Sequence, residues 1–177
     1  DSGSSNTDDL TSNTTPIISG TAEANEEITL ISDQDGVVGT TTADGSGNWS
    51  LTTSALAEAA HSLTSTATDA AGNTGAASAT LAITVDTTNP AAPGTADLDA
   101  GSDSGSADDD DITSSTTPTI SGTAEANATV ILTSDLDGAL GTATADGSGD
   151  WSLTTSPLTE GVHLLTSTAT DAAGNTG

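Results

Sequence analysis

The 177-residue sequence contains no lysine and no arginine, against 26 aspartates and glutamates, so its formal net charge is −26. A chain without basic side chains has no patch that could bind the phosphates of a nucleic acid. It is equally unsuited to adsorb directly to anionic lipid headgroups. The composition therefore argues against nucleic-acid partners and against direct membrane insertion.

Cysteine, methionine, phenylalanine and tyrosine are also absent. Without cysteine the protein can form neither a disulfide framework nor a zinc site built from thiolates. No apolar run approaches the roughly 18 residues of a membrane-spanning helix, and no signal peptide is visible. We expect any export or anchoring signal to lie outside this sequence.

Large aliphatic residues are few, because Leu, Ile and Val together account for only 27 of the 177 residues. Low hydrophobicity combined with high net charge is typical of disordered chains. Two observations oppose that interpretation: apolar residues alternate with polar ones, and each half of the chain has one tryptophan, Trp49 or Trp151. We expect a folded protein whose stability depends on cations.

The chain is a tandem repeat. Residues 1–75 align without a gap to residues 103–177 at an offset of 102, and 54 of the 75 positions are identical. A long fixed period indicates an array of similar modules, in which function commonly belongs to the array. We predict one module at 1–86, lacking its first strand, a linker at 87–94, and a second module at 95–177, lacking its last strand.

Alternation of apolar and polar residues predicts strands and no helix of useful length. Asp33-Gln-Asp-Gly36 and Asp44-Gly-Ser-Gly-Asn48 have the composition of hairpin turns. The predicted strands of the first module are Thr15–Ala22, Ile28–Ser32, Val38–Ala43, Trp49–Thr53, His61–Asp69 and Thr80–Asp86, and a short strand at Ala96–Asp99 enters the second copy. Seven short strands separated by turns predict an all-β fold of tandem immunoglobulin-like Greek-key sandwiches.

The segments TPTISGTAEANATV, GTATADGSGDW, LTSTATDAAGN and ITVDTTNPAAP resemble the bacterial immunoglobulin-like repeats of giant surface adhesins, the biofilm-associated and type I-secreted RTX-type families. The resemblance covers essentially the whole chain. It implies seven-strand sandwiches arranged end to end, with calcium at or near the joints. It also implies an extracellular location, at the bacterial cell surface or secreted.

Acidic residues at strand ends are the candidate calcium ligands, since Ca²⁺ binds six to eight oxygens from carboxylates, amides and carbonyls. In an immunoglobulin topology the exit of module one faces one end of module two, where several such residues could converge. The candidates at this joint are Asp86, Asp171, Glu125, Asp146 and Asn175, with Asp33 and Asp35 as further contributors. The alternative for Asp33, Asp35, Asp44 and Asp146 is that they are ordinary turn residues.

A second candidate site is the acidic loop Asp99–Asp111, whose spacing of aspartates could wrap one ion. Its candidate ligands are Asp99, Asp103 and Asp109, and its counterpart in the first copy is Asp1–Asp9. The alternative is a solvated acidic turn that keeps the array soluble. Asp69, the counterpart of Asp171, completes the set of candidate ligands.

Other polar and aromatic residues give no sign of catalysis. We predict that Trp49 and Trp151 belong to the core, the alternative being platforms on which sugars stack. His61 and His163 stand singly and are expected to be structural. Because no serine or threonine has a basic partner, we assign no enzyme activity.

These observations predict a calcium-rigidified extracellular spacer of a bacterial adhesin, whose partners are neighbouring repeats of the same chain. One alternative is an adhesive module that binds a sugar or a protein. The other is a self-assembling extracellular fibre subunit, in which a neighbour supplies the strand missing after Gly177.

Overall fold

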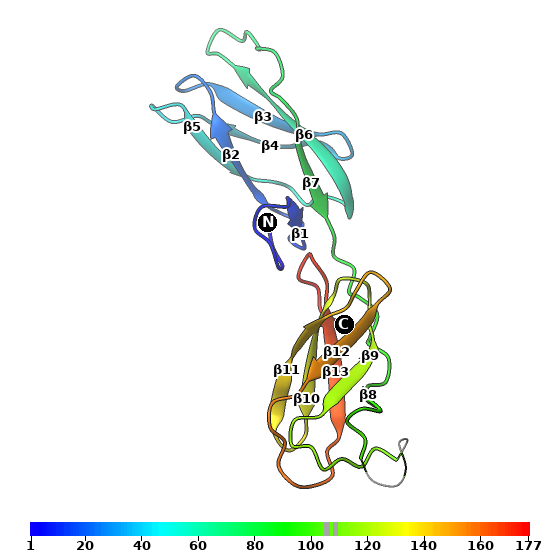
Figure 1. The fold of residues 1–177 in the computed structure, drawn as a ribbon. Helices are drawn as coiled ribbons and strands as arrows, with labels where there is room; N and C mark the ends of the chain where they lie inside the picture. Colours follow the sequence, from blue (N-terminus) through cyan, green and yellow to red (C-terminus); the bar gives the residue numbers. More distant parts are fainter. Residues whose placement is uncertain (105–106, 108–109) are drawn as a thin grey trace. The chain divides into compact units, whose positions relative to one another are not determined.

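The computed structural model describes residues 1–104, 107 and 110–177, and all regular secondary structure in these residues is β-strand. They form two compact units, Asp1–Thr87 and Thr88–Gly177 (Figure 1). The boundary coincides with the start of the predicted linker 87–94, and Pro90 within that linker is buried in unit two. Each unit is a sandwich of two sheets, so the all-β sandwich prediction is confirmed.

Unit one contains seven strands. One sheet has five strands in the order β1-β7-β6-β3-β4, and the other pairs β2 with β5. The strands are β1 (Leu10–Thr11), β2 (Ile17–Thr21), β3 (Glu27–Ser32), β4 (Gly36–Thr42), β5 (Asn48–Thr52), β6 (Ala59–Thr68) and β7 (Leu81–Val85).

Unit two has two three-stranded sheets, β11-β10-β13 and β12-β9-β8, in which β11-β10-β13 corresponds to β4-β3-β6 and β12-β9 to β5-β2 of unit one. Its strands are β8 (Asp97–Leu98), β9 (Thr119–Thr123), β10 (Thr129–Ser134), β11 (Gly138–Thr144), β12 (Asp150–Thr154) and β13 (Leu165–Thr170). All the strands predicted from the alternation are present. The two-residue β1, which pairs in parallel with β7, was not predicted because two residues show no alternation.

The turn residues act as their composition predicts. Ser32 pairs with Gly36 at the end of the β3–β4 hairpin, and Gly36 has a φ of 73°. Gly47 closes the next turn with a φ of 84°, a conformation that glycine adopts without a steric cost. These glycines fix where β4 and β5 begin.

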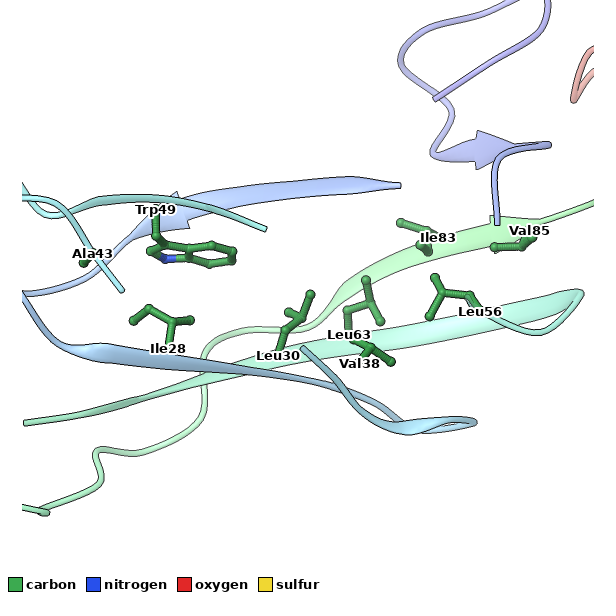
Figure 2. Packing of buried hydrophobic residues seen from close by; sticks show 9 residues of the cluster. All are labelled: Ile28, Leu30, Val38, Ala43, Trp49, Leu56, Leu63, Ile83 and Val85. Atoms are coloured by element: carbon green, nitrogen blue, oxygen red, sulfur yellow. The ribbon is translucent and has the colours of Figure 1, made fainter. Parts of the chain in front are cut away.

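The core of unit one lies between its two sheets. Figure 2 shows Trp49 facing Ile28 of β3, while Leu63 of β6 lies near Ile83 of β7. Trp49 is 8% exposed and its counterpart Trp151 is 3% exposed, which confirms that both tryptophans belong to the core. The hydrophobic residues are few, but most of the large ones are gathered in these two clusters.

Leu81 differs from the sequence-based expectation. In the predicted strand Thr80–Asp86, alternation puts Leu81, Ile83 and Val85 on one inward face, and Ile83 and Val85 are 8% and 1% exposed. Leu81, however, is 37% exposed. It faces a groove beside β2, which has no strand on its outer edge among the described residues.

Candidate functional site

Three loops of unit two that contain predicted ligands lie at one end of the sandwich. The first residue of β10 pairs with the last residues of both β11 and β13, and the first residue of β12 pairs with the last of β9. The loops that follow β9, β11 and β13 therefore share an end. They contain the predicted ligands Glu125, Asp146, Asp171 and Asn175.

Asp171 already binds its own loop. Its Oδ1 accepts hydrogen bonds from the Gly174 and Asn175 amides at 2.8 and 2.9 Å, and its Oδ2 accepts one from Asn175 Nδ2 at 2.9 Å. Asp69 does the same with Asn73 in unit one, and the Asn73 side-chain amide is the main reason why the pKa of Asp69 lies below its ordinary value. Each carboxylate thus closes the Asp-x-x-Gly-Asn loop that it begins.

Asp44 and Asp146 close a similar turn between strands. Asp44 Oδ1 accepts the Ser46 and Asn48 amides at 2.8 and 2.9 Å, and Asp146 Oδ1 accepts the equivalent amides at 2.7 and 3.1 Å. Hydrogen bonding, first from the Asn48 backbone, lowers the pKa of Asp44. This geometry supports the turn-residue alternative for both aspartates and leaves Asp146 Oδ2 for another contact.

Asp33 and Asp35 connect the β3–β4 turn to β6 and to the loop before β6 through side-chain hydrogen bonds. Asp33 Oδ1 accepts the Ser62 amide at 2.7 Å, which is the main reason why the pKa of Asp33 is lowered. Asp35 Oδ2 accepts the Ala57 amide at 3.1 Å and lies 3.6 Å from His61 Nδ1. These contacts reach beyond the hairpin turn, so both aspartates stabilise the packing of neighbouring segments, and a calcium role for them stays a prediction.

His61 belongs to the same hydrogen-bonded group, and its partners were not predicted from the sequence. Its Nδ1 lies 2.9 Å from Ser32 Oγ, and its Nε2 donates to the Ala57 carbonyl at 2.9 Å. His163 makes the equivalent contacts at 2.9 and 2.8 Å. The available signal was that a serine and an aspartate recur in both copies at fixed distances from the histidine.

Asp86, a predicted ligand at the joint, directly follows β7 (Leu81–Val85) in unit one. It is half-buried, and its amide donates to the Thr11 carbonyl at 2.9 Å. Glu58 lies nearby, because its carboxylate accepts the hydroxyl of Thr87. A calcium site shared between Asp86 and unit two stays a prediction.

The acidic loop before β9 contains one unusual oxygen. Asp103 Oδ2 accepts the Asp111 amide at 3.2 Å, but Asp103 Oδ1 is buried without a hydrogen-bond partner among the described residues. Asp99 begins the loop by accepting the Gly101 amide on Oδ1 and the Asp103 amide on its carbonyl. The third candidate, Asp109, lies outside the described residues.

Within residues 1–104, 107 and 110–177, no three His, Asp or Glu side chains lie close enough together to form a metal site on their own. Over the same residues, no helix is long and apolar enough to cross a membrane. The described carboxylates are instead spread over several loops, with Asp99, Asp103, Asp110 and Asp111 in the loop before β9. Backbone carbonyls, or side chains from more than one loop, would have to complete any calcium site built from these described residues.

The profile of the bacterial Ig-like domain matches residues 1–87 and 90–177. The chain belongs to this family. Its two Ig-like domains correspond to the two units, and each match covers nearly all of one unit. No curated protein matches the chain.

Two solved structures are similar to the pair of Ig-like domains. The BSP domain of a biofilm-associated protein is 21% identical, with a TM-score of 0.34 over 94% of this chain and 26% of that one. A Ca²⁺-stabilised adhesin that helps an Antarctic bacterium reach out and bind ice is 28% identical, with a TM-score of 0.46 over 97% of this chain and 44% of that one. The chain thus spans less than half the length of either structure.

Proposed function

We propose that the two Ig-like domains form a calcium-rigidified spacer of a bacterial surface adhesin, acting outside the cell and without enzymatic activity. The family and the tandem arrangement support a modular extracellular role. The description of one similar protein as a Ca²⁺-stabilised adhesin and of the other as biofilm-associated agrees with this proposal. The neighbouring partners are repeats of the same kind.

The proposed calcium binding rests on one observation: Asp103 Oδ1 is buried and has no hydrogen-bond partner among the described residues. A buried carboxylate oxygen without a donor is costly unless a cation binds it. Asp103 lies in a loop with Asp99, Asp110 and Asp111, and the whole chain has no lysine or arginine that could neutralise it. The donor set is all oxygen, which is the chemistry that calcium prefers.

The spacer role follows from electrostatics. Carboxylates closer together than the Debye length of about 8 Å at physiological ionic strength repel each other with little screening. Bound Ca²⁺ supplies the missing positive charge and joins the loops that hold its ligands. Extracellular modules typically bind calcium with dissociation constants of about 10⁻⁴–10⁻³ M, so such sites fill outside cells.

The test is a calcium titration of the whole protein and of Asp103→Asn, measured by calorimetry and by thermal unfolding. Calcium should raise the Tm of the parent, because a ligand that binds only the folded state stabilises it. Asp103→Asn should weaken binding at this loop by roughly tenfold, since calcium affinity depends on the number of charged ligands. Asp97→Asn, which removes an exposed charge from β8 in the same unit, is the matched control.

Equal Tm values in excess chelator and in several millimolar calcium, at matched ionic strength, would contradict the calcium role. If Asp97→Asn weakens binding as much as Asp103→Asn, the effect is general electrostatic attraction rather than a site. An adhesive module for sugars is the less favoured function, because both tryptophans are buried and present no stacking surface.

A further inference from the structure

An apolar patch lies on the surface of unit two, at the turn between β10 and β11 and in the segment before β13. This outer patch consists of Leu136, Val162 and Leu164, which are 55%, 86% and 68% exposed. A Cβ atom on Gly161 would lie 3.3 Å from Leu136 Cδ1, so Leu136 lies beside the residue that precedes Val162. The Asp135 amide donates to the Leu164 carbonyl at 3.2 Å, which holds Leu164 next to the same turn. Exposed aliphatic side chains that adjoin one another mark interaction surfaces, whereas isolated ones are normal.

The outward direction of these side chains is a property of their positions in the sandwich. Val162 and Leu164 flank His163, whose side chain is only 11% exposed, and neighbouring side chains of an extended segment point to opposite faces. The equivalent positions in unit one, Ala60 and Ser62, are also exposed, although β7 pairs there with β6. Pairing with a neighbouring strand therefore does not cover this face.

The two units differ at all three positions of the outer patch. Unit one has Gln34, Ala60 and Ser62 where unit two has Leu136, Val162 and Leu164. Unit one forms its sandwich with these small or polar residues, so the fold does not require large aliphatic side chains at the surface. The outer patch is thus an additional feature of unit two, and it exposes apolar surface to water at a cost in free energy.

Carboxylates form a rim around the outer patch. Asp135 Oδ1 accepts the Leu164 amide at 2.8 Å, and Asp137 Oδ2 accepts the Thr159 amide at 3.0 Å. Glu160 is exposed and precedes the valine of the patch by two residues. The same three acidic residues recur in unit one as Asp33, Asp35 and Glu58. The rim is therefore common to both units, and only the aliphatic cluster is particular to unit two.

The sheet beside the outer patch is uncharged. Strands β10, β11 and β13 contain no charged residue, and Ile131 on the central strand β10 is 37% exposed. Thr129 in β10 stands where β3 of unit one has Glu27. A partner that covers the patch and this sheet face therefore meets carboxylates at the rim and none on the strands.

We propose that the outer patch is a docking surface for a cationic amphipathic segment of another protein. Aliphatic side chains of that segment cover the patch, and its basic groups lie against the carboxylates of the rim. Burial of apolar surface supplies the affinity, while the complementary charges select the partner and speed its association. A second copy of this chain does not fit, because it contains no lysine or arginine and would bring carboxylates against carboxylates.

The proposal goes beyond the spacer function and does not depend on it. None of the three aliphatic residues is a predicted calcium ligand, and exchanging them for the residues of unit one changes no charge. Loss of docking in such a variant would leave calcium binding intact, and loss of calcium binding in Asp103→Asn would leave the outer patch intact. The two proposals can therefore fail separately.

The test uses a short, end-capped peptide of alternating leucine and lysine as the probe, added to the whole protein at constant calcium and ionic strength. Amide NMR shifts should change at Leu136, Val162 and Leu164. Combining Leu136→Gln, Val162→Ala and Leu164→Ser should weaken binding by roughly tenfold or more, because it removes most of the apolar surface that the peptide covers. A peptide of alternating serine and lysine controls for charge, and its weak binding should be the same for parent and variant.

The reverse exchange in unit one keeps the test decisive even if the first variant loses stability. Gln34→Leu, Ala60→Val and Ser62→Leu together should create a second site for the leucine–lysine peptide, because the acidic rim is already present there. A folded variant with the parent's Tm that gains no site would overturn the proposal.

Three further results would also overturn it. One is equal affinity of the parent and the first variant for the leucine–lysine peptide. Another is equally tight binding of a peptide of alternating leucine and glutamate, because the rim would then not select a cation. The third is a dimer of the parent in sedimentation that is lost in the variant, because the occupant would then be a second copy.

Discussion

The contact between Gly20 and Trp49 shows how individual residues define each sandwich. A Cβ atom on Gly20 would lie 2.6 Å from Trp49 Cζ2, and one on Gly122 would lie 2.7 Å from the same atom of Trp151. Both indoles are buried between two sheets, so relieving this overlap would require the core packing to shift. The glycine at this position of β2 and β9 is therefore required by the tryptophan that packs on it.

We predict that Gly20→Ala destabilises unit one by about 1–3 kcal/mol, the usual cost of overpacking a core. Gly122→Ala should affect unit two similarly. Chemical denaturation followed by tryptophan fluorescence measures both effects.

Gly45→Ala is the control, because a Cβ there has no atom within 4 Å. If Gly45→Ala costs as much as Gly20→Ala, the destabilisation comes from the general loss of glycine and not from the tryptophan contact.

Three carboxylates give the protein a predictable response to acid. Hydrogen bonds, led by those from Ser62, Asn48 and Asn73, lower the pKa values of Asp33, Asp44 and Asp69 below the ordinary 3.8. A pKa that is lower in the folded state contributes stability above the unfolded value, and that contribution is lost as the pH falls through the folded value.

We therefore expect Asp33→Asn to lower the Tm near neutral pH, and the difference from the parent to shrink as the pH falls from about 5 to 2. Thermal unfolding across this range measures the difference at each pH. Glu27→Gln, which removes an exposed carboxylate at the start of β3, controls for the loss of one charge. A difference that stays constant down to the lowest pH would show that Asp33 does not act through its ionised form.

At the level of elements, β3 organises the larger sheet of unit one, because it pairs with both β4 and β6. His61 ties these elements to the loop before β6. Its Nε2 must donate, since the Ala57 carbonyl can only accept, and this leaves Nδ1 to accept from Ser32 when the ring is neutral. The buried ring thus satisfies polar groups from two elements.

We predict that His61→Ala destabilises unit one by about 2–4 kcal/mol, because it leaves a cavity and removes a partner from the buried Ser32. Thermal unfolding of the whole protein measures the loss. His163→Ala should cost less in unit two, since its side chain is 11% exposed and that of His61 is 0% exposed.

Ser62→Ala, an exposed position next to His61 on β6, is a control for unspecific effects on that strand. A larger loss of stability from His163→Ala than from His61→Ala would contradict the view that the more deeply buried histidine contributes more to the stability of its unit.

At the level of the whole molecule, a net charge of −26 opposes any close approach of acidic loops. If calcium is shared between the units, removal of a ligand should leave each sandwich folded and let the pair bend. We predict that Asp86→Ala and Asp171→Ala reduce the maximum dimension measured by small-angle scattering at calcium concentrations that saturate the parent. Both should also weaken calcium binding.

The structure supplies a sharper control for this experiment. Asp171→Ala also removes three hydrogen bonds within its own loop, and Asp69→Ala removes the equivalent bonds in unit one. If Asp69→Ala reduces the maximum dimension as much as Asp171→Ala does, the reduction comes from disorder of the loop and not from loss of a calcium ligand at the joint. Asp8→Ala, in the acidic loop of the first copy, should leave the dimension unchanged.

The sequence by itself determined the repeat, the strands and the turns, because these depend on local alternation and on glycines at fixed positions. Trp49 and Trp151 could be assigned to the core for the same reason: each alternates with a leucine in its strand. The absence of lysine and arginine determined the electrostatic character of the whole chain without reference to any fold.

Tertiary structure decided what each carboxylate does, because a carboxylate is held by whichever amides the fold brings to it. Asp33 accepts from Ser62, which is 29 residues away, and Asp35 accepts from Ala57, which is 22 residues away. No local pattern distinguishes these aspartates from Asp103, whose Oδ1 is buried with no partner among the residues that the structure describes. The groove beside β2 could not be predicted from the sequence either. Alternation places Leu81 on the inner face, but it cannot show that β2 pairs with only one strand among the described residues.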